Sequence, residues 1–224
     1  MDRIPRDFQM PTQSDRSVAN EVFNKRVYAK ARIGFDVRAG ELWLDVGANC
    51  GAFSRYVIDR GGTVEAYEPV PRNVALWRQN VRSSRAVIME TAVAQKSGPI
   101  VLRVDVQNYQ RTGRWNRRGQ ATKVPGVAFA DLLQGREHLN VKMDIEGCEY
   151  DIIVEPQEWW RVDKLVFEYH FLPRPELDLA RTIVNELSGA FPNVWAGRAL
   201  LLPLGASPRL WTWFPDATNV FCWR

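Results

Sequence analysis

The sequence predicts an α/β protein with a single doubly wound, mostly parallel sheet, and three observations lead to this prediction. An apolar, β-prone run at 42–46 enters a turn that contains Gly47 and Gly51, and a helical pattern of apolar residues three and four apart follows. A second strand-like run, 63–67, ends at an acid, Glu68. Further strand-like runs alternate with helical patterns along the 224 residues, a length sufficient to bury a sheet on both faces.

The first 40 residues are predicted to form an arm and a helix that precede the sheet. Residues 1–14 contain two prolines and no clear period, which indicates irregular backbone. Asp15 is the predicted N-cap of a helix with an apolar stripe that runs from Val18 to Val27. The turn 38–41 then leads into the first strand, 42–46.

The middle of the chain is predicted to complete the first half of the sheet and then to leave it. Pro71 suits the first turn of a helix, and a third strand follows at 85–89. Residues 99–127 are predicted to form a β-excursion with a basic tip, after which a short helix covers 129–133.

The second half of the sheet is predicted from four further runs. The fourth strand, 139–143, delivers Asp144 at its end, and a helix at 149–154 stops before Pro156. The fifth strand is 163–170, and an amphipathic helix from Leu177 to Leu187 is closed by Ser188 and Gly189. The last two of the seven expected strands are placed around 199–203 and 219–223.

Composition and charge exclude several classes of protein. No apolar run approaches the ~18 residues that span a bilayer, and the polar, charged start at 1–7 is unlike a signal peptide. The three cysteines lie far apart, so neither a disulfide framework nor a cysteine metal site is indicated. We therefore expect a cytoplasmic location and no membrane partner. The net charge of +4 is a mild basic bias, and it permits an anionic partner without requiring one.

The residues themselves predict a nucleotide-like ligand at the first turn. Gly47 and Gly51 allow the backbone to approach a ligand, although Asn49 stands where a dinucleotide fingerprint has its second glycine. Glu68 is placed to accept hydrogen bonds from ribose hydroxyls. Nicotinamide and flavin cofactors fit these features equally well, and a purely structural turn is the alternative for the two glycines.

Three motifs in order decide between these cofactors. They are D-V-G-A-N-x-G at 45–51, E-P at 68–69 and K-x-D-I-E-G-x-E at 142–149. Their order and spacing resemble the FkbM family of S-adenosylmethionine-dependent O-methyltransferases, over a stretch from about Asp15 to about Leu172. The resemblance implies a Rossmann-like class I methyltransferase fold, a single methyltransferase domain over 1–224 and S-adenosylmethionine as cofactor. It also implies that segment 1–40 packs over the site.

The resemblance assigns further cofactor contacts. Asp45 is expected to orient the turn and the methionine amino group, and Thr91 and Ala92 fall where the adenine pocket of the family lies. Asp144 is expected beside the transferable methyl group; the alternative is that it merely caps the helix that follows.

The polar groups at the ends of the fourth and fifth strands are the catalytic candidates. Asp144, Glu168 and His170 are predicted to act there, with His170 as general base and Glu168 orienting its ring. With Glu146 they form a set that is an alternative site for Mg²⁺ or Mn²⁺, which we do not predict. Glu146 and Glu149 are equally well read as residues of a helix start.

The expected acceptor is a hydroxyl-bearing small molecule or a sugar or glycan. Arg114 and Trp115 in the basic tip, together with Glu146, are predicted to bind it; a solvated hairpin end is the alternative for the tip. RNA ribose 2'-O-methylation is a second hypothesis, suggested by the charge and the arginines. Lys164 argues against it, because this lysine is predicted at the wrong end of its strand. A non-catalytic binding module on the same fold is the third.

Overall fold

The computed structural model describes residues 3–104, 119–146, 148–170, 177–196 and 217–224. Within these ranges it forms a seven-stranded sheet in the order β10-β11-β9-β8-β1-β2-β3. All neighbours are parallel except the two pairs that β11 makes, which are antiparallel. The strands are β1 (Leu42–Val46), β2 (Thr63–Tyr67), β3 (Ala86–Met89), β8 (Leu139–Met143), β9 (Val162–His170), β10 (Asn193–Ala196) and β11 (Ala217–Trp223). The predicted doubly wound, mostly parallel sheet is confirmed.

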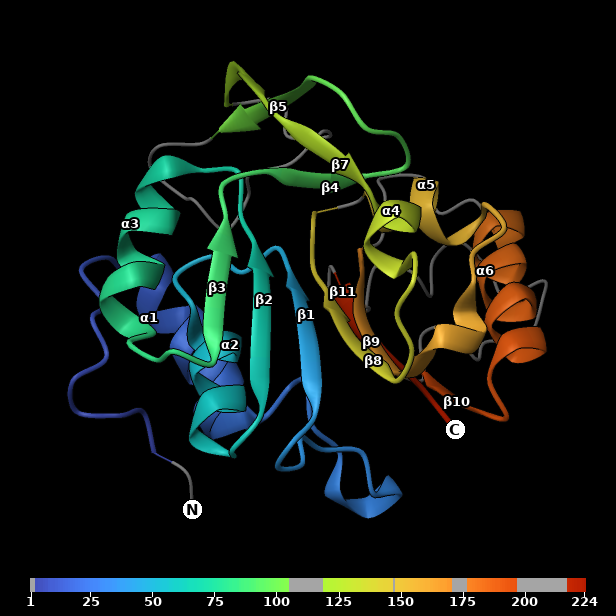
Figure 1. Ribbon diagram of the computed structural model, residues 1–224, viewed down its shortest axis with the longest axis horizontal. Coiled ribbons are helices and arrows are strands. Elements are labelled where there is room, and N and C mark those ends of the chain that lie inside the picture. Colours follow the sequence, from blue (N-terminus) through green and yellow to red (C-terminus); the bar gives the residue numbers. More distant parts are fainter. Residues whose placement is uncertain (1–2, 105–118, 147, 171–176, 197–216) are drawn as a thin grey trace, which may run out of the picture.

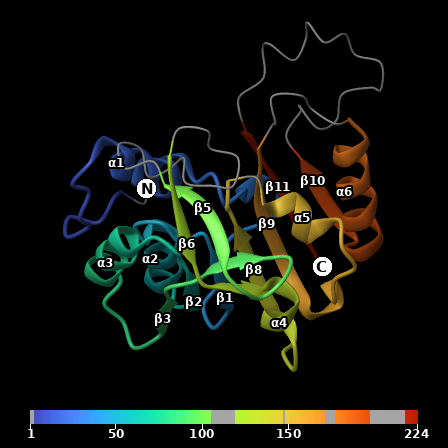
Figure 2. The same ribbon diagram turned by 90° about the horizontal axis from the view of Figure 1, so that it is seen from above.

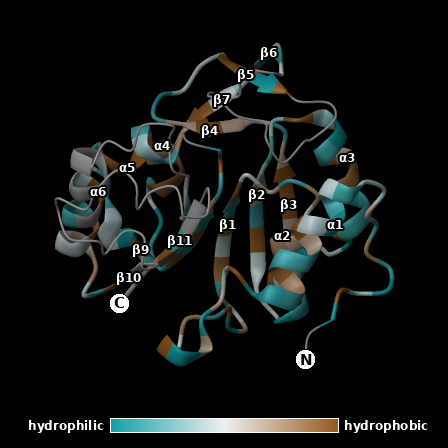
Figure 3. Ribbon diagram, turned by 180° about the vertical axis from the view of Figure 1, so that it is seen from behind, coloured by the Kyte–Doolittle hydropathy of each residue, from teal (hydrophilic) through white to brown (hydrophobic). Residues whose placement is uncertain are grey.

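Helices cover both faces of this sheet, as Figure 2 shows from above. Alternate residues of a strand point to opposite faces, so Leu44 and Val46 enter one core and Trp43 the other. One face is covered by α4 (Phe129–Leu133), α5 (Glu149–Ile153) and α6 (Leu177–Ala190). The other face is covered by α1 (Gln13–Ala19), the π-helix η1 (Asn20–Lys25), α2 (Ala52–Asp59) and α3 (Pro71–Asn80). Burial on both sides explains why the strands are largely hydrophobic (Figure 3).

The excursion after β3 forms two small sheets above the carboxyl ends of the parallel strands (Figure 1). β4 (Ala92–Ala94) pairs with β7 (Gly126–Ala128), and β5 (Ile100–Val104) pairs with β6 (Gln120–Val124). The predicted basic tip falls on 105–118, so Arg114 and Trp115 lie outside the described residues.

The start of the first helix differs from the prediction. Thr12, not Asp15, is the N-cap, and its hydroxyl accepts a hydrogen bond from the Asp15 backbone N–H at 3.1 Å. The Asp15 carboxylate in turn accepts from the Thr12 backbone N–H at 2.9 Å, so the two residues form a capping box. Asp15 also forms an ion pair with Arg72 at the start of α3, which ties the N-terminal helix to the sheet domain.

One C-terminal prediction needs correction, and another falls outside the described residues. The helix predicted to close at Ser188 and Gly189 continues to Ala190. A strand was expected around 199–203, which lies outside the described residues; the strand that pairs with β11 is β10, at 193–196. Among the helices that the structure describes, none combines the length and apolar character needed to cross a membrane.

Candidate active site

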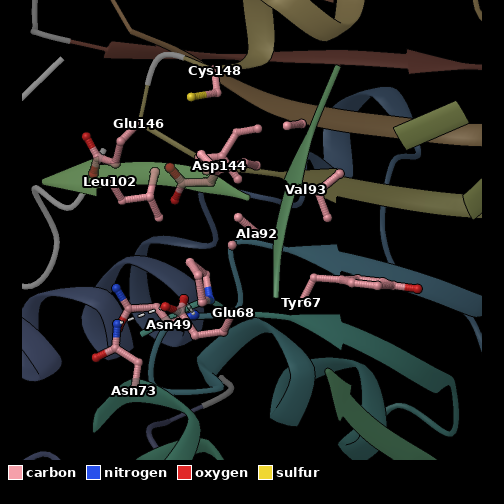
Figure 4. A pocket seen from close by; sticks show the side chains of 15 residues that line it. Asn49, Tyr67, Glu68, Asn73, Ala92, Val93, Leu102, Asp144, Glu146 and Cys148 are labelled. Carbon is pink, nitrogen blue, oxygen red and sulfur yellow. Dashed lines mark hydrogen bonds between the residues drawn. The ribbon is translucent and has the colours of Figure 1, made fainter. Parts of the chain in front are cut away.

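A pocket lies at the carboxyl ends of the parallel strands, below the small sheets. Figure 4 shows Asn49, Glu68 and Asn73 gathered at one end and Asp144, Glu146 and Cys148 at the other. The described lining residues are Gly47, Asn49, Tyr67, Glu68, Pro69, Asn73, Ala92, Val93, Ala94, Ile100, Leu102, Asp144, Ile145, Glu146 and Cys148.

The two glycines of the first turn are required for different structural reasons. Gly47 lines the pocket with φ +79°, and a Cβ on it would lie 1.9 Å from the backbone oxygen of Asp144. Gly51 also has a positive φ, but a Cβ there would meet the ring of Trp77 at 2.8 Å. Gly51 is not among the described lining residues, and close packing under α3 explains it.

Asn49 adopts the left-handed conformation that the missing glycine would supply, with φ 49°. Asparagine tolerates this region better than most residues, because its side chain bonds locally. Here the side-chain oxygen accepts the Cys50 backbone N–H at 2.7 Å. The departure from the dinucleotide fingerprint is therefore compatible with an intact turn.

Glu68 connects the turn to the segment after β2. One carboxylate oxygen accepts the Asn49 backbone N–H and the other accepts the Val70 backbone N–H, each at 2.9 Å. Burial raises the pKa of Glu68, and these hydrogen bonds counter part of that effect. Asn73 Nδ2 also donates to Glu68 Oε1 at 3.4 Å, so Oε2 is the oxygen with capacity for a further hydrogen bond toward the pocket.

Asp45 lies beneath the pocket and is not among its described lining residues. It is fully buried, and its Oδ2 accepts the Ser54 hydroxyl at 2.6 Å. Lys142 Nζ lies 3.3 Å from Asp45 Oδ1 and donates to the Gly47 carbonyl oxygen at 2.7 Å. Burial opposes the charge of Lys142, but Asp45 and Asp144 outweigh it and raise the pKa of this lysine. One signal for this role is present in the sequence, a charged residue inside a largely apolar strand.

Asp144 lines the pocket and accepts a hydrogen bond from Tyr28, a residue that sequence reasoning missed. The Tyr28 hydroxyl lies 2.8 Å from Asp144 Oδ2, and Lys142 Nζ lies 3.9 Å from the same oxygen. Tyr28 follows η1, so the N-terminal segment contacts Asp144 through this side chain. Burial raises the pKa of Tyr28 well above its usual value, which keeps the hydroxyl protonated as a donor.

The remaining predicted residues are brought together only in part. Glu168 lies level with Asp144, because Met143 pairs with Phe167, and its charge acts on both Tyr28 and Lys142. His170 ends β9, but its side chain lies outside the described residues. Ala92 lines the pocket, whereas the Thr91 hydroxyl donates to the Pro125 carbonyl at 3.0 Å.

Comparison with known proteins adds the family. The FkbM methyltransferase domain matches residues 45–190. The chain belongs to the FkbM methyltransferase family. The predicted resemblance is confirmed, and the cofactor of this methyltransferase is S-adenosylmethionine. No curated protein matches the chain.

Solved structures similar to this FkbM methyltransferase include a fibrillarin complex and a precorrin methyltransferase. A chain of the fibrillarin/Nop5p complex has a TM-score of 0.50 and 14% identity, over 89% of this chain and 80% of that one. Precorrin-6y C5,15-methyltransferase from Geobacter metallireducens has a TM-score of 0.47 and 12% identity, over 100% and 95%. At these identities the likeness concerns the fold alone.

The residues of the pocket fit the cofactor of this FkbM methyltransferase. Gly47 lines the pocket without a side chain, and Glu68 lines it with a carboxylate that could accept hydrogen bonds from ribose hydroxyls. Within the described part of the chain, no three histidine, cysteine, aspartate or glutamate side chains are placed to hold a metal ion. The alternative site for Mg²⁺ or Mn²⁺ depends on His170 and stays a hypothesis.

Proposed function

We propose that this FkbM methyltransferase transfers the methyl group of S-adenosylmethionine to a hydroxyl of a sugar or glycan-like acceptor. The observation that carries the proposal is that Glu68 and Asp144 line one pocket from opposite ends (Figure 4). When bound, the cofactor supplies an electrophilic methyl group on a positively charged sulfur. Glu68 would hold the ribose, and the Gly47 turn would admit the methionine part.

A neutral hydroxyl is a weak nucleophile, so its proton must pass to a base as the new bond to carbon forms. Asp144 offers a carboxylate at the pocket wall, oriented by Tyr28. Glu168 lies level with it on the neighbouring strand, and His170 stays the predicted alternative base. Holding the acceptor oxygen near the methyl carbon would supply the other part of the rate enhancement.

The acceptor side of the proposal rests on Glu146, Arg114 and Trp115. Glu146 lines the pocket near Asp144, where its carboxylate could accept hydrogen bonds from sugar hydroxyls. The roles of Arg114 and Trp115 remain predictions from the sequence.

The RNA hypothesis has less support at the site. Lys164 Nζ donates to the Asp36 carbonyl oxygen at 2.8 Å and pairs with Glu41, near the amino end of β9. Lys142 is at the site, but it is buried and already donates to Gly47. Neither lysine is therefore placed to activate a ribose hydroxyl.

The experiment is methyl transfer from S-adenosylmethionine labelled in its methyl group to a panel of monosaccharides, glycans, polyketide alcohols and RNAs. We expect label in a sugar or glycan, in a form that survives alkaline hydrolysis as an ether does and a methyl ester does not. Label confined to RNA would support the ribose hypothesis. Failure to bind the cofactor at millimolar concentration would indicate the non-catalytic module.

A further inference from the structure

Tyr28 and Asp144 are 116 residues apart in sequence and are joined by a hydrogen bond of 2.8 Å. The position of the hydroxyl is fixed by the packing of the ring. Tyr28 is buried, its ring meets the Phe53 ring edge-on with centroids 5.5 Å apart, and Lys142 Nζ lies 5.3 Å from its centroid. A donor held this rigidly orients the group that accepts from it.

Both donors approach the same oxygen of Asp144. Tyr28 donates to Oδ2, and Lys142 lies 3.9 Å from Oδ2. The two contacts fix where the carboxylate lies in the pocket wall. Burial raises the pKa of Tyr28, so its hydroxyl keeps its proton and remains a hydrogen-bond donor to Asp144.

We propose that Tyr28 is a positioning residue that aims the Asp144 carboxylate at the positively charged sulfur of the cofactor. The N-terminal segment thereby contributes to the preference for S-adenosylmethionine over S-adenosylhomocysteine, whose sulfur is neutral. This inference rests on the proposed placement of the methyl group beside Asp144. Attraction between opposite charges in a partly buried site falls as the carboxylate turns away, and the neutral product loses nothing by the same change.

The chain offers a matched control for the chemistry of this bond. The Tyr56 hydroxyl donates to Asp36 Oδ1, also at 2.8 Å, and Tyr56 is as buried as Tyr28. Neither Tyr56 nor Asp36 is among the described residues that line the pocket. Tyr56→Phe therefore removes the same kind of hydrogen bond from the same core without touching Asp144.

The test is calorimetric titration of the full chain with S-adenosylmethionine and, separately, with S-adenosylhomocysteine. The readout is the dissociation constant for S-adenosylhomocysteine divided by that for S-adenosylmethionine, and this ratio is compared between variants. In Tyr28→Phe we expect affinity for S-adenosylmethionine to fall about tenfold, because the Asp144 carboxylate is no longer held toward the positively charged sulfur. Affinity for S-adenosylhomocysteine should change less than about twofold, and Tyr56→Phe should leave the ratio unchanged.

Equal losses of affinity for both ligands leave the ratio unchanged; this outcome would assign Tyr28 a merely structural role and overturn the proposal. Asp144→Asn provides a second variant if Tyr28→Phe does not fold. It must lower the ratio by at least as much, and adding Tyr28→Phe to it must lower the ratio no further. If the unaltered protein binds neither ligand, the proposed function itself fails. If it binds both and the ratio does not change in Tyr28→Phe, only the inference about Tyr28 fails.

Discussion

Lys142 Nζ lies 3.3 Å from Asp45 Oδ1, and the two residues stand directly opposite one another on the adjacent strands β8 and β1. Both side chains are at most 4% exposed. Two parallel strands thus carry one buried ion pair at the level where they approach the pocket. Lys142 also donates to Gly47, so the pair is connected to the turn that follows β1.

Replacement of Lys142 by methionine should destabilise the protein by about 3–5 kcal/mol, because it leaves the Asp45 charge buried without a counter-charge. Urea unfolding measures the change. Lys164→Met is the control, since Glu41 keeps hydrogen bonds from the Arg38 N–H and the Trp43 ring and is partly exposed. We expect that variant to lose less, about 1–3 kcal/mol, because Glu41 is not left without hydrogen-bond partners. Similar losses in the two variants would contradict the special position of Lys142.

Gly47→Ala should prevent the close approach of the first turn to the segment after β8. The new Cβ would lie 1.9 Å from the Asp144 backbone oxygen, and backbone cannot move aside as a flexible side chain can. Gly40 has nearly the same φ, +82° against +79°, with nothing within 4 Å of an added Cβ. Gly40→Ala thus measures conformational strain alone, about 1–2 kcal/mol.

The Gly47 variant should lose about 1–3 kcal/mol more than the Gly40 variant and should lose cofactor binding. Thermal unfolding with and without S-adenosylmethionine measures both effects. Equal stability of the two variants would mean that the turn relaxes easily, and the structural reason given for Gly47 would be wrong.

The sheet and the acids around it were predictable because their signals are local. Strands buried on both faces appear as apolar runs, and parallel strands bring their carboxyl ends to one edge. Glu68 and Asp144 could be assigned to that edge from this rule alone. Both line the pocket.

The contacts that Tyr28 and Lys142 make with the Asp144 carboxylate were not predictable from such local signals. Tyr28 reads in the sequence as one more aromatic residue of a helical region, and its partner is 116 residues away. Lys142 was visible as a charge in an apolar strand, but its partner depends on which strands are neighbours. The N-cap was missed for a local reason, since Thr12 and Asp15 are both good caps three residues apart and only the reciprocal hydrogen bonds decide between them.

Glu68→Gln should weaken S-adenosylmethionine binding by about 1.5–3 kcal/mol, roughly 10- to 150-fold, because hydrogen bonds to a charged acceptor are lost. An amide also has one acceptor oxygen where the carboxylate uses two, for Asn49 and Val70. Glu65→Gln is the control on the same strand, because Glu65 pairs with Arg136 instead of facing the pocket. Calorimetric titration compares them, and equal affinities in the two variants would remove Glu68 from the cofactor site.

Cys148 should be the cysteine that reacts with iodoacetamide, and the cofactor should protect it. It is half-buried and lines the pocket, whereas Cys50 and Cys222 are fully buried. Burial raises the pKa of Cys50 to about 12, and it raises the pKa of Cys222 as well, so little reactive thiolate forms at either residue near pH 8.

Peptide mass spectrometry over a time course at pH 8 should find label first at Cys148, and this labelling should be slower when S-adenosylmethionine is present. Glu68→Gln serves as the control, because weaker binding should restore the labelling rate at the same cofactor concentration. If the cofactor did not slow the labelling of Cys148, the part of the pocket around Asp144, Glu146 and Cys148 would stay accessible when the cofactor binds.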